Sequence, residues 1–478
     1  MTEIRCPLDL AAEKYGDQPA IILGDITITY ARYHRLVAGT TLRLQKMGIT
    51  PGQRVAIRAE NSCDYVIALM ALLKVGAIAC PVSPRFPAAR TEQILSQLSV
   101  RAFVSDGPIL SKTVGGPGQR LSLPDVIDRS GVGQAGNVSD IDLERDATIV
   151  LTSGTAGEPK AVLHTLGSHY YSARGSNENI ALGPGDRWLL SLPLYHVGGL
   201  AVLFRTILAG AAVVLPIDSR DPLQSIAPLE ITHLSVVSTQ LYRILGMKTS
   251  WPTLRAVLLG GGPPAPALVR SAHERGLPLF TSYGLTEMAS QVTTTRAGDK
   301  LEKLLTSGRP LERRKLKIAA DNEILVGGEC LFKGYVDRDT VAGVTADGWF
   351  ATGDLGHVDA DGYLVVTGRK DHMFISGGEN IQPEEIEGAL MALDSVERAV
   401  VVPREDAEFG VRPVAFVKWR GRRPKQSEIV EKLRQDLPGF KIPVSFYGWP
   451  ERDSLTLDKP DRGFLAELAS ESGEEEFR

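Results

Sequence analysis

Short apolar runs alternate with stretches of helical character along most of this sequence, and that alternation is the feature that most constrains its fold. The runs are rich in Val, Leu, Ile and Ala, and each ends in Gly, Ser, Thr or Pro, as in ATIVLTSG, DRWLLSLPL, AAVVLPI, HLSVVS, LRAVLLGGG and LPLFTSYGLTE. Near the N-terminus, residues 20–39 predict a hairpin followed by an amphipathic helix, and residues 54–82 predict strand, helix, strand. Strands separated by helices indicate a parallel sheet with crossover connections. Because ligands of open α/β sheets bind where the strands end, we expect the functional site at the ends of these runs.

The pattern changes after Ser307. Residues 323–335 and 348–368 look like antiparallel hairpins, the second turning at Asp361-Gly362, and Pro383 then opens a helix ahead of the runs VERAVVVP, VRPVAFVKW and SEIVEKLRQDL. We therefore expect a large α/β N-terminal domain over residues 1–370, with parallel and mixed sheets, crossover helices and a small β-barrel-like subdomain. A small, mobile α+β C-terminal domain is expected over residues 371–478. Residues 105–137 are expected to loop over the surface, and the last ten residues to fray.

Composition excludes several classes of protein. The 478 residues include 53 Lys and Arg and 57 Asp and Glu, which gives a formal charge of −4. The sequence therefore has no excess of positive charge that would indicate a nucleic-acid partner. The N-terminus lacks the apolar core of a secretory signal, and the run VIALMALL, ending at Lys74, is too short to span a bilayer, so we expect no integral membrane segment. Scattered cysteines disfavour disulfides or a zinc site and suit a reducing, cytoplasmic setting; they are Cys6, Cys63, Cys80 and Cys330.

A polar loop, LTSGTAGEPKAVLHT, follows the apolar run ATIV at residues 151–165. Hydroxyl groups, unencumbered backbone amides and the charge of Lys160 are what a chain uses to surround phosphate oxygens. The loop is not a Walker A motif, because Pro159 stands where the second glycine belongs. A polar surface loop is the plain alternative when this stretch is taken alone.

Five ordered motifs together resemble the acyl-adenylate-forming superfamily, which comprises acyl-CoA synthetases, peptide-synthetase adenylation domains and luciferases. The loop at Thr152–Ala161 is similar to its phosphate loop, and LGGGPP to the glycine turn beside adenine. SYGLTEMAS resembles the YGxTE motif, GWFATGDLGHVDADGYLVVTGRKD the TGD and GR motifs, and SGGENIQPEEIE the C-terminal glycine segment. The order and spacing agree over nearly the whole chain.

The resemblance implies a two-step enzyme, an AMP-forming acid–thiol ligase, that uses ATP, Mg²⁺ and coenzyme A. A carboxylate attacks the α-phosphorus of ATP and releases pyrophosphate, and a thiol then displaces AMP from the acyl-adenylate. Such chemistry needs in-line positioning and charge neutralisation more than covalent catalysis.

Carried over onto this sequence, the resemblance assigns roles to particular residues. Tyr283 would lie against adenine, Thr286 would bond the α-phosphate, Glu287 would bind Mg²⁺, and Asp354, assisted by Arg369, would accept the ribose hydroxyls. The β- and γ-phosphates would be held by Thr152, Ser153, Gly154, Thr155, Gly157 and Lys160, and the rest of the nucleotide site would be formed by Gly260, Gly261, Gly262, Ser282 and Gly284. In this loop Ala156 and Ala161 replace a threonine and a glycine that the superfamily usually has.

The C-terminal part carries its own implied roles. Lys459 matches the lysine that bridges the carboxylate and the α-phosphate, although Asp458 replaces the usual glycine before it, and a surface lysine is the alternative. Asp371 matches the hinge about which the C-terminal domain swings. Gly377 and Gly378 would approach the pantetheine of coenzyme A.

The acid substrate is indicated by further runs. His196 in LLSLPLYHVGGL holds the superfamily's gating position near the incoming carboxylate, and Arg243 follows Thr239 by one helical turn. These runs, with EFGVRPVAFV, resemble the 2-succinylbenzoate–CoA ligases of menaquinone biosynthesis. Only one carboxylate of that substrate is activated, and Arg243 is the candidate partner of the other. The alternative is that Arg243 is simply an exposed residue of the helix.

Other functions stay open at this point. The chain could be a CoA ligase for another small aromatic or acyl acid, or a stand-alone adenylation enzyme that loads a carrier protein. A nucleotide-sensing relic is disfavoured by the retained Glu287, Asp354, Arg369 and Lys459, and a luciferase-like oxygenase by resemblance alone. The oligomeric state is undetermined, with a homodimer as one option.

Overall fold

The structure is a computed structural model. It describes residues 3–107, 119–130, 140–152, 159–248, 251–262, 266–337, 340–342, 344–345, 347–377, 379–406, 409–450 and 461–471. Among these residues, no helix is both long and apolar enough to cross a membrane.

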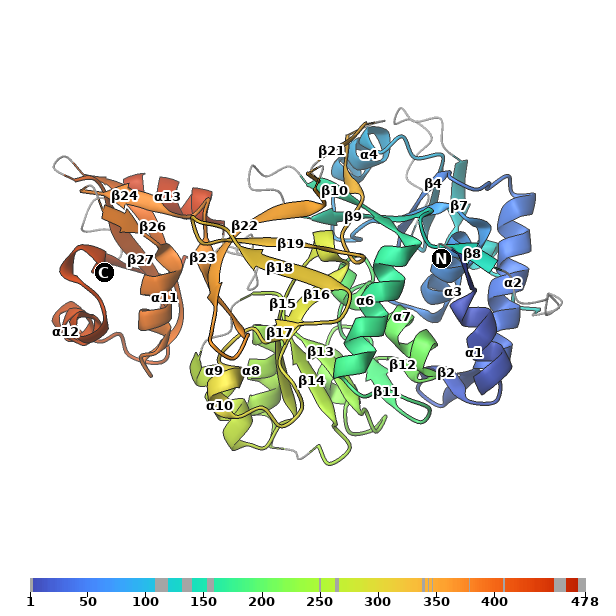
Figure 1. The fold of residues 1–478 in the computed structure, drawn as a ribbon, viewed down its shortest axis with the longest axis horizontal. Coiled ribbons are helices and arrows are strands. Elements are labelled where there is room, and N and C mark those ends of the chain that lie inside the picture. Colours follow the sequence, from blue (N-terminus) through green and yellow to red (C-terminus); the bar gives the residue numbers. More distant parts are fainter. Residues whose placement is uncertain are drawn as a thin grey trace.

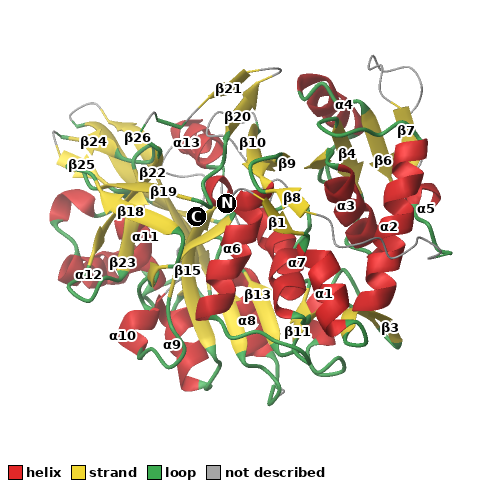
Figure 2. Ribbon diagram, turned by 45° about the vertical axis from the view of Figure 1, so that its right-hand side comes forward, coloured by secondary structure: helices red, strands yellow, loops and turns green. Residues whose placement is uncertain are grey.

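Two mixed sheets form the body of the molecule (Figures 1 and 2). The first has the order β21 (Thr340–Ala342), β20 (Gly334–Asp337), β10 (Lys160–Thr165), β9 (Asp146–Thr152), β5 (Ile78–Pro81), β4 (Arg54–Arg58), β6 (Ala102–Ser105) and β7 (Gln119–Ser122). The second has the order β17 (Arg309–Pro310), β16 (Ser290–Thr294), β15 (Leu279–Leu285), β14 (Ala256–Leu259), β13 (His233–Val236), β11 (Arg187–Leu189), β12 (Ala212–Leu215), β2 (Pro19–Leu23) and β3 (Ile26–Thr29). In the first sheet the neighbouring strands β9, β5, β4, β6 and β7 pair in parallel, as the alternating pattern predicts. In the second sheet the same holds for β15, β14, β13, β11, β12 and β2.

Helices cross between these strands and pack on both sheets. They are α1 (Pro7–Tyr15), α2 (Tyr30–Lys46), α3 (Cys63–Val75), α4 (Ala88–Gln97), α5 (Leu123–Val126), α6 (Leu166–Asn179), α7 (Val197–Ala209), α8 (Ser238–Gly246), α9 (Pro266–Glu274) and α10 (Leu301–Leu304). Short 3₁₀ turns lie at η1 (Pro222–Ser225) and η2 (Thr286–Met288), and β1 (Glu3–Arg5) pairs with β8 (Asp140–Asp142). The largest apolar cluster joins α3 and α7, which lie between the sheets in Figure 2, to strands of both sheets. The buried helix predicted around VIALMALL is α3.

The prediction of a surface loop over residues 105–137 is wrong for part of that range. Gln119–Ser122 forms β7 and pairs in parallel with β6, and Leu123–Val126 forms α5. Leu123 and Val126 are buried in the main core, so a few apolar residues suffice to fix this stretch within a segment rich in Gly, Pro and Ser. Residues 108–118 and 131–139 lie outside the described residues.

An antiparallel sheet follows, in the order β18 (Arg314–Ile318), β19 (Glu323–Gly328), β22 (Trp349–Val358) and β23 (Leu364–Arg369). The β22–β23 hairpin brings Val358 opposite Leu364, so it turns over Asp361-Gly362 as predicted. This sheet has an apolar cluster that includes Ile324, Val326 and Tyr283, and it therefore packs on the end of β15.

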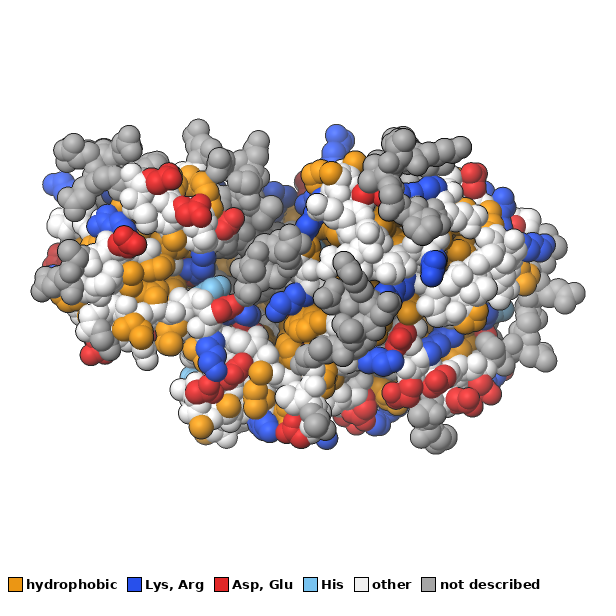
Figure 3. All heavy atoms as spheres, turned by 90° about the horizontal axis from the view of Figure 1, so that it is seen from above, with side chains coloured by type: hydrophobic (Ala, Val, Ile, Leu, Met, Phe, Trp, Pro, Cys, Tyr) orange, Lys and Arg blue, Asp and Glu red, His pale blue; other side chains and the backbone are white. Residues whose placement is uncertain are grey.

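The chain from Phe374 onward forms a lobe at the left of Figure 1, and Figure 3 shows the outline of the molecule narrowing beside it. The lobe contains β24 (Phe374–Ser376), β25 (Glu379–Ile381), α11 (Pro383–Met391), β26 (Val396–Asp406), β27 (Gly410–Trp419), α12 (Gln426–Asp436), η3 (Gly439–Lys441), β28 (Phe446–Gly448) and α13 (Arg462–Glu471). Pro383 occupies the first turn of α11, as the sequence predicts. Two apolar clusters are confined to this lobe, which makes it a unit with its own core. The expected fold class is confirmed, whereas the boundary at 370/371 stays a prediction.

Candidate active site

The carboxyl ends of β14 and β15 place the predicted nucleotide residues side by side. Gly260 to Gly262 follow β14, and Ser282, on the neighbouring β15, donates from its hydroxyl to the carbonyl of Leu259 over 2.8 Å. Gly261 has φ +90°, and a Cβ there would lie 2.9 Å from a methyl carbon of Val237, so only glycine fits this turn without strain. A flat ligand can therefore approach the backbone closely at this edge.

A chain of polar contacts joins Tyr283, Asp354, Arg369 and Asp371. The Tyr283 hydroxyl donates to Oδ2 of Asp354 over 2.6 Å, and Nη1 of Arg369 donates to Oδ1 over 2.8 Å. Nε of Arg369 donates to Oδ1 of Asp371 over 2.8 Å, and Nη2 donates to Oδ2 over 3.1 Å. The residues expected at the ribose thus lie together and are linked directly to the expected hinge residue.

Burial and neighbouring polar groups have opposite effects on the pKa of the Asp354 carboxyl. Burial raises the pKa of the Asp354 carboxyl above its ordinary value, although the Tyr283 hydroxyl and the Arg369 guanidinium oppose that shift. Hydrogen bonds to Asp371 raise the pKa of Arg369, which therefore stays a cation. A carboxylate held between a phenol and a guanidinium is oriented to accept hydrogen bonds from a diol.

Thr286 and Glu287 form the 3₁₀ turn η2, directly after β15. Glu287 is buried, and its Oε1 accepts a hydrogen bond of 2.6 Å from the hydroxyl of Tyr335. Within the described part of the chain, no lysine, arginine or histidine pairs with this carboxylate, and no group of three or more Asp, Glu, His and Cys side chains could hold a metal by itself. A lone buried carboxylate fits Mg²⁺, which is commonly bound by one or two carboxylates together with substrate phosphates.

Hydrogen bonds among the buried side chains of His164, Thr148 and His169 hold this turn in place through the carbonyl of Thr286. Nε2 of His164 donates to the carbonyl of Thr286 over 2.7 Å, which leaves Nδ1 to accept from the hydroxyl of Thr148 at 3.3 Å. That hydroxyl then accepts from Nε2 of His169 over 2.8 Å. Burial lowers the pKa of His164 to about 4, so the imidazole is neutral at neutral pH. No sequence pattern pointed to this role of His164.

The backbone after the turn is strained. Ala289 has φ +51° and Ser290 has φ +136°, both in the left-handed region that residues other than glycine rarely adopt. The Ser172 hydroxyl holds Ala289 by donating to its carbonyl over 3.1 Å. Ser290 in turn returns so close to β15 that a Cβ on Gly284 would lie 2.3 Å from its carbonyl oxygen. Strain of this kind is concentrated at functional sites.

Arg205 is a buried cation that the sequence reasoning missed. It is 1% exposed, lies on α7, and donates from Nη2 to Gln291 Oε1 over 2.8 Å and to Ser290 Oγ over 3.1 Å. Among the residues that the structure describes, its Nε has no hydrogen-bond partner and no carboxylate pairs with it. Burial lowers its pKa to about 9. The available signal was a single arginine within the apolar helix VGGLAVLFRTILA.

The phosphate loop is described only at its two ends. Thr152 ends β9 and pairs with Lys160, which begins β10. Ala161, one of the departures from the superfamily pattern, is buried within β10, where a methyl group packs into the core. Ser153, Gly154, Thr155, Ala156 and Gly157 lie outside the described residues.

The residues expected at the acid differ in exposure. His196 is exposed and occupies the position just before the first turn of α7, with its ring centroid 4.7 Å from that of Tyr195. Thr239 is half-buried near the start of α8, in the predicted helix. Arg243 is exposed on the last turn of α8, so its assigned partner role is not supported by burial.

The C-terminal candidates lie in or beside the lobe. Gly377 follows β24 with φ +58° and donates from its amide to the carbonyl of Phe409 over 3.0 Å. Asp371 immediately precedes the lobe and pairs with Arg369 as described. Gly378, Asp458 and Lys459 lie outside the described residues.

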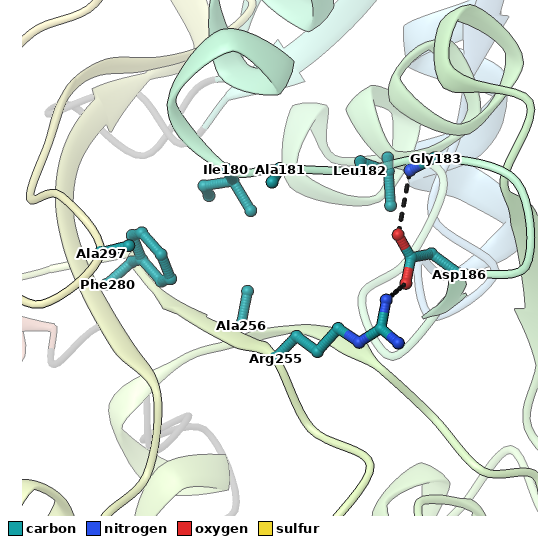
Figure 4. A pocket seen from close by; sticks show the side chains of 9 residues that line it. All are labelled: Ile180, Ala181, Leu182, Gly183, Asp186, Arg255, Ala256, Phe280 and Ala297. Atoms are coloured by element: carbon teal, nitrogen blue, oxygen red, sulfur yellow. Dashed lines mark hydrogen bonds and ion pairs between the residues drawn. The ribbon is translucent and has the colours of Figure 1, made fainter.

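A surface cavity of about 320 Å³ lies elsewhere (Figure 4). It is lined by Ala256 and Phe280, near the amino ends of β14 and β15, and by the paired Asp186 and Arg255. These positions are at the opposite edge of the sheet from Tyr283, so the cavity is not part of the candidate site.

Comparison with known proteins agrees with this geometry. The model of the family "AMP-binding enzyme" matches residues 8–336, and the model of "AMP-binding enzyme C-terminal domain" matches residues 385–452. The chain belongs to the AMP-binding enzyme family. The expected membership of the acyl-adenylate-forming superfamily is therefore confirmed.

Relatives of known function cover almost the whole chain. A 2-succinylbenzoate–CoA ligase of Bacillus licheniformis is 33% identical over 450 residues, which are 91% of this chain and 94% of the relative. One from Geobacillus kaustophilus is 34% identical over 444 residues, 90% of each chain.

Solved structures extend the similarity to the fold. The o-succinylbenzoate CoA synthetase of Bacillus subtilis in complex with its acyl-adenylate intermediate has a TM-score of 0.87 and 30% identity, covering 97% of this chain and 98% of that one. The same synthetase in complex with ATP and magnesium ion has a TM-score of 0.86 and 30% identity, covering 97% and 100%.

Proposed function

We propose that this chain is a 2-succinylbenzoate–CoA ligase. A carboxylate oxygen of the acid attacks the α-phosphorus of ATP, an acyl–O–P bond forms, and pyrophosphate leaves. The thiolate of coenzyme A then attacks the acyl carbon, a thioester forms, and AMP leaves. The observation that carries the proposal is the contact of Asp354 with Tyr283 and Arg369, with Glu287 on the turn directly after the strand of Tyr283. The buried Arg205 contacts Ser290 just beyond that turn, and among the described residues it has no carboxylate partner.

The nucleotide roles follow from the contacts. Tyr283 and Arg369 orient the Asp354 carboxylate toward the ribose hydroxyls, and the glycine turn after β14 leaves room for adenine. Glu287 would hold Mg²⁺, which would neutralise charge on the phosphates. Thr286, whose carbonyl is fixed by His164, donates toward the α-phosphate. Thr152, Lys160 and the loop between them hold the outer phosphates.

Recognition of the second carboxylate is the step that distinguishes this substrate from simple acids. Arg205 and Arg243 are the two candidates. Arg205 is supported by its burial, its free Nε and its contact with the strained Ser290 just beyond Glu287. A guanidinium without an anion in a buried site costs free energy that a carboxylate ligand removes. We therefore assign the second carboxylate to Arg205 and keep Arg243 as the alternative, with His196 and Thr239 lining the approach.

We assign to the C-terminal lobe the conformational change between adenylation and thioester formation. Rotation about Asp371 would exchange Lys459, needed for adenylation, for Gly377 and Gly378, needed near the pantetheine. The paired Arg369 and Asp371 support this role, because they connect the ribose carboxylate to a residue just before the lobe. A cytoplasmic setting and a homodimer are further proposals, for which cell fractionation and light scattering are the tests.

Pyrophosphate release with a panel of acids tests the function. We expect release with 2-succinylbenzoate, Mg²⁺ and ATP, a thioester of matching mass when coenzyme A is added, and loss of the first step in Lys459→Ala. Faster turnover of another small aromatic acid would reassign the substrate. Transfer only to a carrier protein would reassign the acceptor, and no release with any acid would overturn the enzyme reading.

A further inference from the structure

Glu287 is held at both of its ends by one short segment of the chain. Its carbonyl accepts a hydrogen bond of 2.7 Å from the amide of Phe332, and its Oε1 accepts one of 2.6 Å from the hydroxyl of Tyr335. The segment is 45 or more residues further along the chain, so this attachment depends on tertiary structure. Because the phenol bonds Oε1, the second carboxylate oxygen is available to a cation among the described contacts.

Tyr335 is itself firmly placed. It lies on β20, where it pairs with Val162 of β10. Its ring packs edge-on against Phe332, with centroids 4.9 Å apart and planes at 67°, and against Phe350 at 6.2 Å and 68°. A phenol fixed by its backbone and by two neighbouring rings holds its hydroxyl in one direction.

The same ring also meets the lysine of the phosphate loop. Nζ of Lys160, two residues before Val162 on β10, lies 5.1 Å from the centre of the Tyr335 ring, within the range of a cation–π contact. One side chain therefore touches both the carboxylate expected to bind metal and the cation expected to bind phosphate. Lys160 and Glu287 form no ion pair with each other among the described contacts, so neither neutralises the other.

We propose that Tyr335 is a positioning residue for Mg²⁺·ATP, which orients Glu287 through its hydroxyl and holds Lys160 over its ring. This inference rests on the proposed function, because it deepens the nucleotide site of that same enzyme. Partners that orient a metal ligand commonly change metal affinity by tenfold or more when they are removed.

The hydroxyl is tested by Tyr335→Phe, which keeps every ring contact. The measurement is calorimetric binding of ATP at increasing Mg²⁺ concentration, with AMP binding as the reference. We expect the Mg²⁺ concentration for half-maximal ATP binding to rise about tenfold, and AMP affinity to stay within about twofold. The matched control is Tyr363→Phe, which removes a phenol–carboxylate hydrogen bond to Asp299 away from the site. An unchanged Mg²⁺ dependence, or an equal change in the control, overturns the proposal.

The route through Glu287 is tested by a double-mutant cycle. In the Glu287→Gln background, Tyr335→Phe should change the Mg²⁺ dependence by less than about twofold, because the carboxylate that it orients is gone. The same tenfold effect in both backgrounds would mean that Tyr335 does not act through Glu287, and would overturn the proposal. Thermal unfolding of each variant verifies that it folds.

The ring is tested by comparing Tyr335→Leu with Tyr335→Phe at saturating Mg²⁺. Loss of the ring should weaken ATP binding about threefold further, the size expected for an exposed cation–π contact. Equal affinity of the two variants would overturn the part of the proposal that concerns Lys160. These experiments contain neither acid nor coenzyme A, so they are independent of whether 2-succinylbenzoate is the substrate.

Discussion

The hydroxyl of Tyr283 donates a hydrogen bond of 2.6 Å to the carboxylate of Asp354, 71 residues further along the chain. Tyr283 lies at the end of β15 in the second mixed sheet, whereas Asp354 lies on β22 of the antiparallel sheet. The contact therefore joins two sheets at the place where the nucleotide is expected. Arg369 occupies the second oxygen of the same carboxylate, so the group that would receive a ribose is oriented from both sides.

Tyr283→Phe should weaken nucleotide binding. The variant keeps the ring for adenine but frees one oxygen of Asp354, so the dissociation constant of AMP should rise about fivefold, as expected for one hydrogen bond. Titration calorimetry with AMP measures this effect, with Tyr363→Phe as the control. Unchanged AMP affinity would show that orientation of Asp354 does not depend on the phenol.

Arg205→Lys should impair recognition of the dicarboxylate. A lysine keeps the charge but loses the planar fork that binds a carboxylate through two parallel hydrogen bonds. We expect the KM for 2-succinylbenzoate to rise at least about tenfold, by the free energy of a hydrogen bond to a charged group, while AMP affinity stays unchanged.

The exposed Arg243 provides the comparison for this variant. Arg243→Ala should raise the same KM by less than about twofold if Arg205 is the partner of the second carboxylate, since surface pairs contribute little. If only Arg243→Ala raised this KM tenfold, Arg243 on α8 would be the partner of the second carboxylate. An equal loss in Arg205→Lys with benzoate-type monoacids would show that the effect is general and not directed at the second carboxylate.

Acidification should destabilise the fold through His164. Its pKa of about 4 in the folded chain lies below the value of about 6.5 expected in the unfolded chain. The unfolded chain therefore takes up the proton first as the pH falls. The stabilisation is complete above about pH 6.5 and is lost between there and pH 4, by about 3 kcal/mol at most.

The measurement for His164 is the free energy of unfolding by urea from pH 7 to pH 4. His164→Gln keeps an N–H donor for the Thr286 carbonyl but cannot titrate, so its stability should fall less over this range. His169, whose pKa burial also lowers, adds a slope of the same sign in both proteins. Parallel curves for the two proteins would exclude His164 as the source.

Gly284→Ala should disturb the turn that carries Glu287. The added methyl group would lie 2.3 Å from the carbonyl oxygen of Ser290, so β16 must move away from β15. We expect unfolding stability to fall by about 2 kcal/mol and pyrophosphate release to slow. Gly388→Ala is the control, because a methyl group there meets nothing within 4 Å and lies inside α11. A variant at Gly284 as active and stable as the parent would contradict the close approach.

Much of the fold was predictable because its signals are local. The apolar runs that became β9, β11, β12, β13, β14 and β15 each carry their pattern within a few residues, and so does the proline that opens α11. The hairpin turn over Asp361-Gly362 is equally local. The loop prediction was wrong for residues 119–126 because the buried side chains of Leu123 and Val126 outweigh a composition that is typical of loops.

The partners of the candidate residues were not predictable in the same way. Arg243 was placed on the correct helix, but helical spacing alone does not say which side faces solvent. Arg205 meets Ser290 across 85 residues of sequence, and Tyr335 meets Glu287 across 48. Such contacts depend on how helices and sheets pack, for which the single sequence carries no short-range signal.

The sequence by itself determined the order of strands and helices, the family and the positions of the motif residues, because hydrophobic period, turn residues and motif spacing are properties of neighbouring residues. Only the tertiary structure decided which of these side chains meet: Asp354 between Tyr283 and Arg369, and Glu287 against Tyr335. The physical reason is that hydrogen bonds act over about 3 Å, so their partners are set by the packing of sheets far apart in sequence.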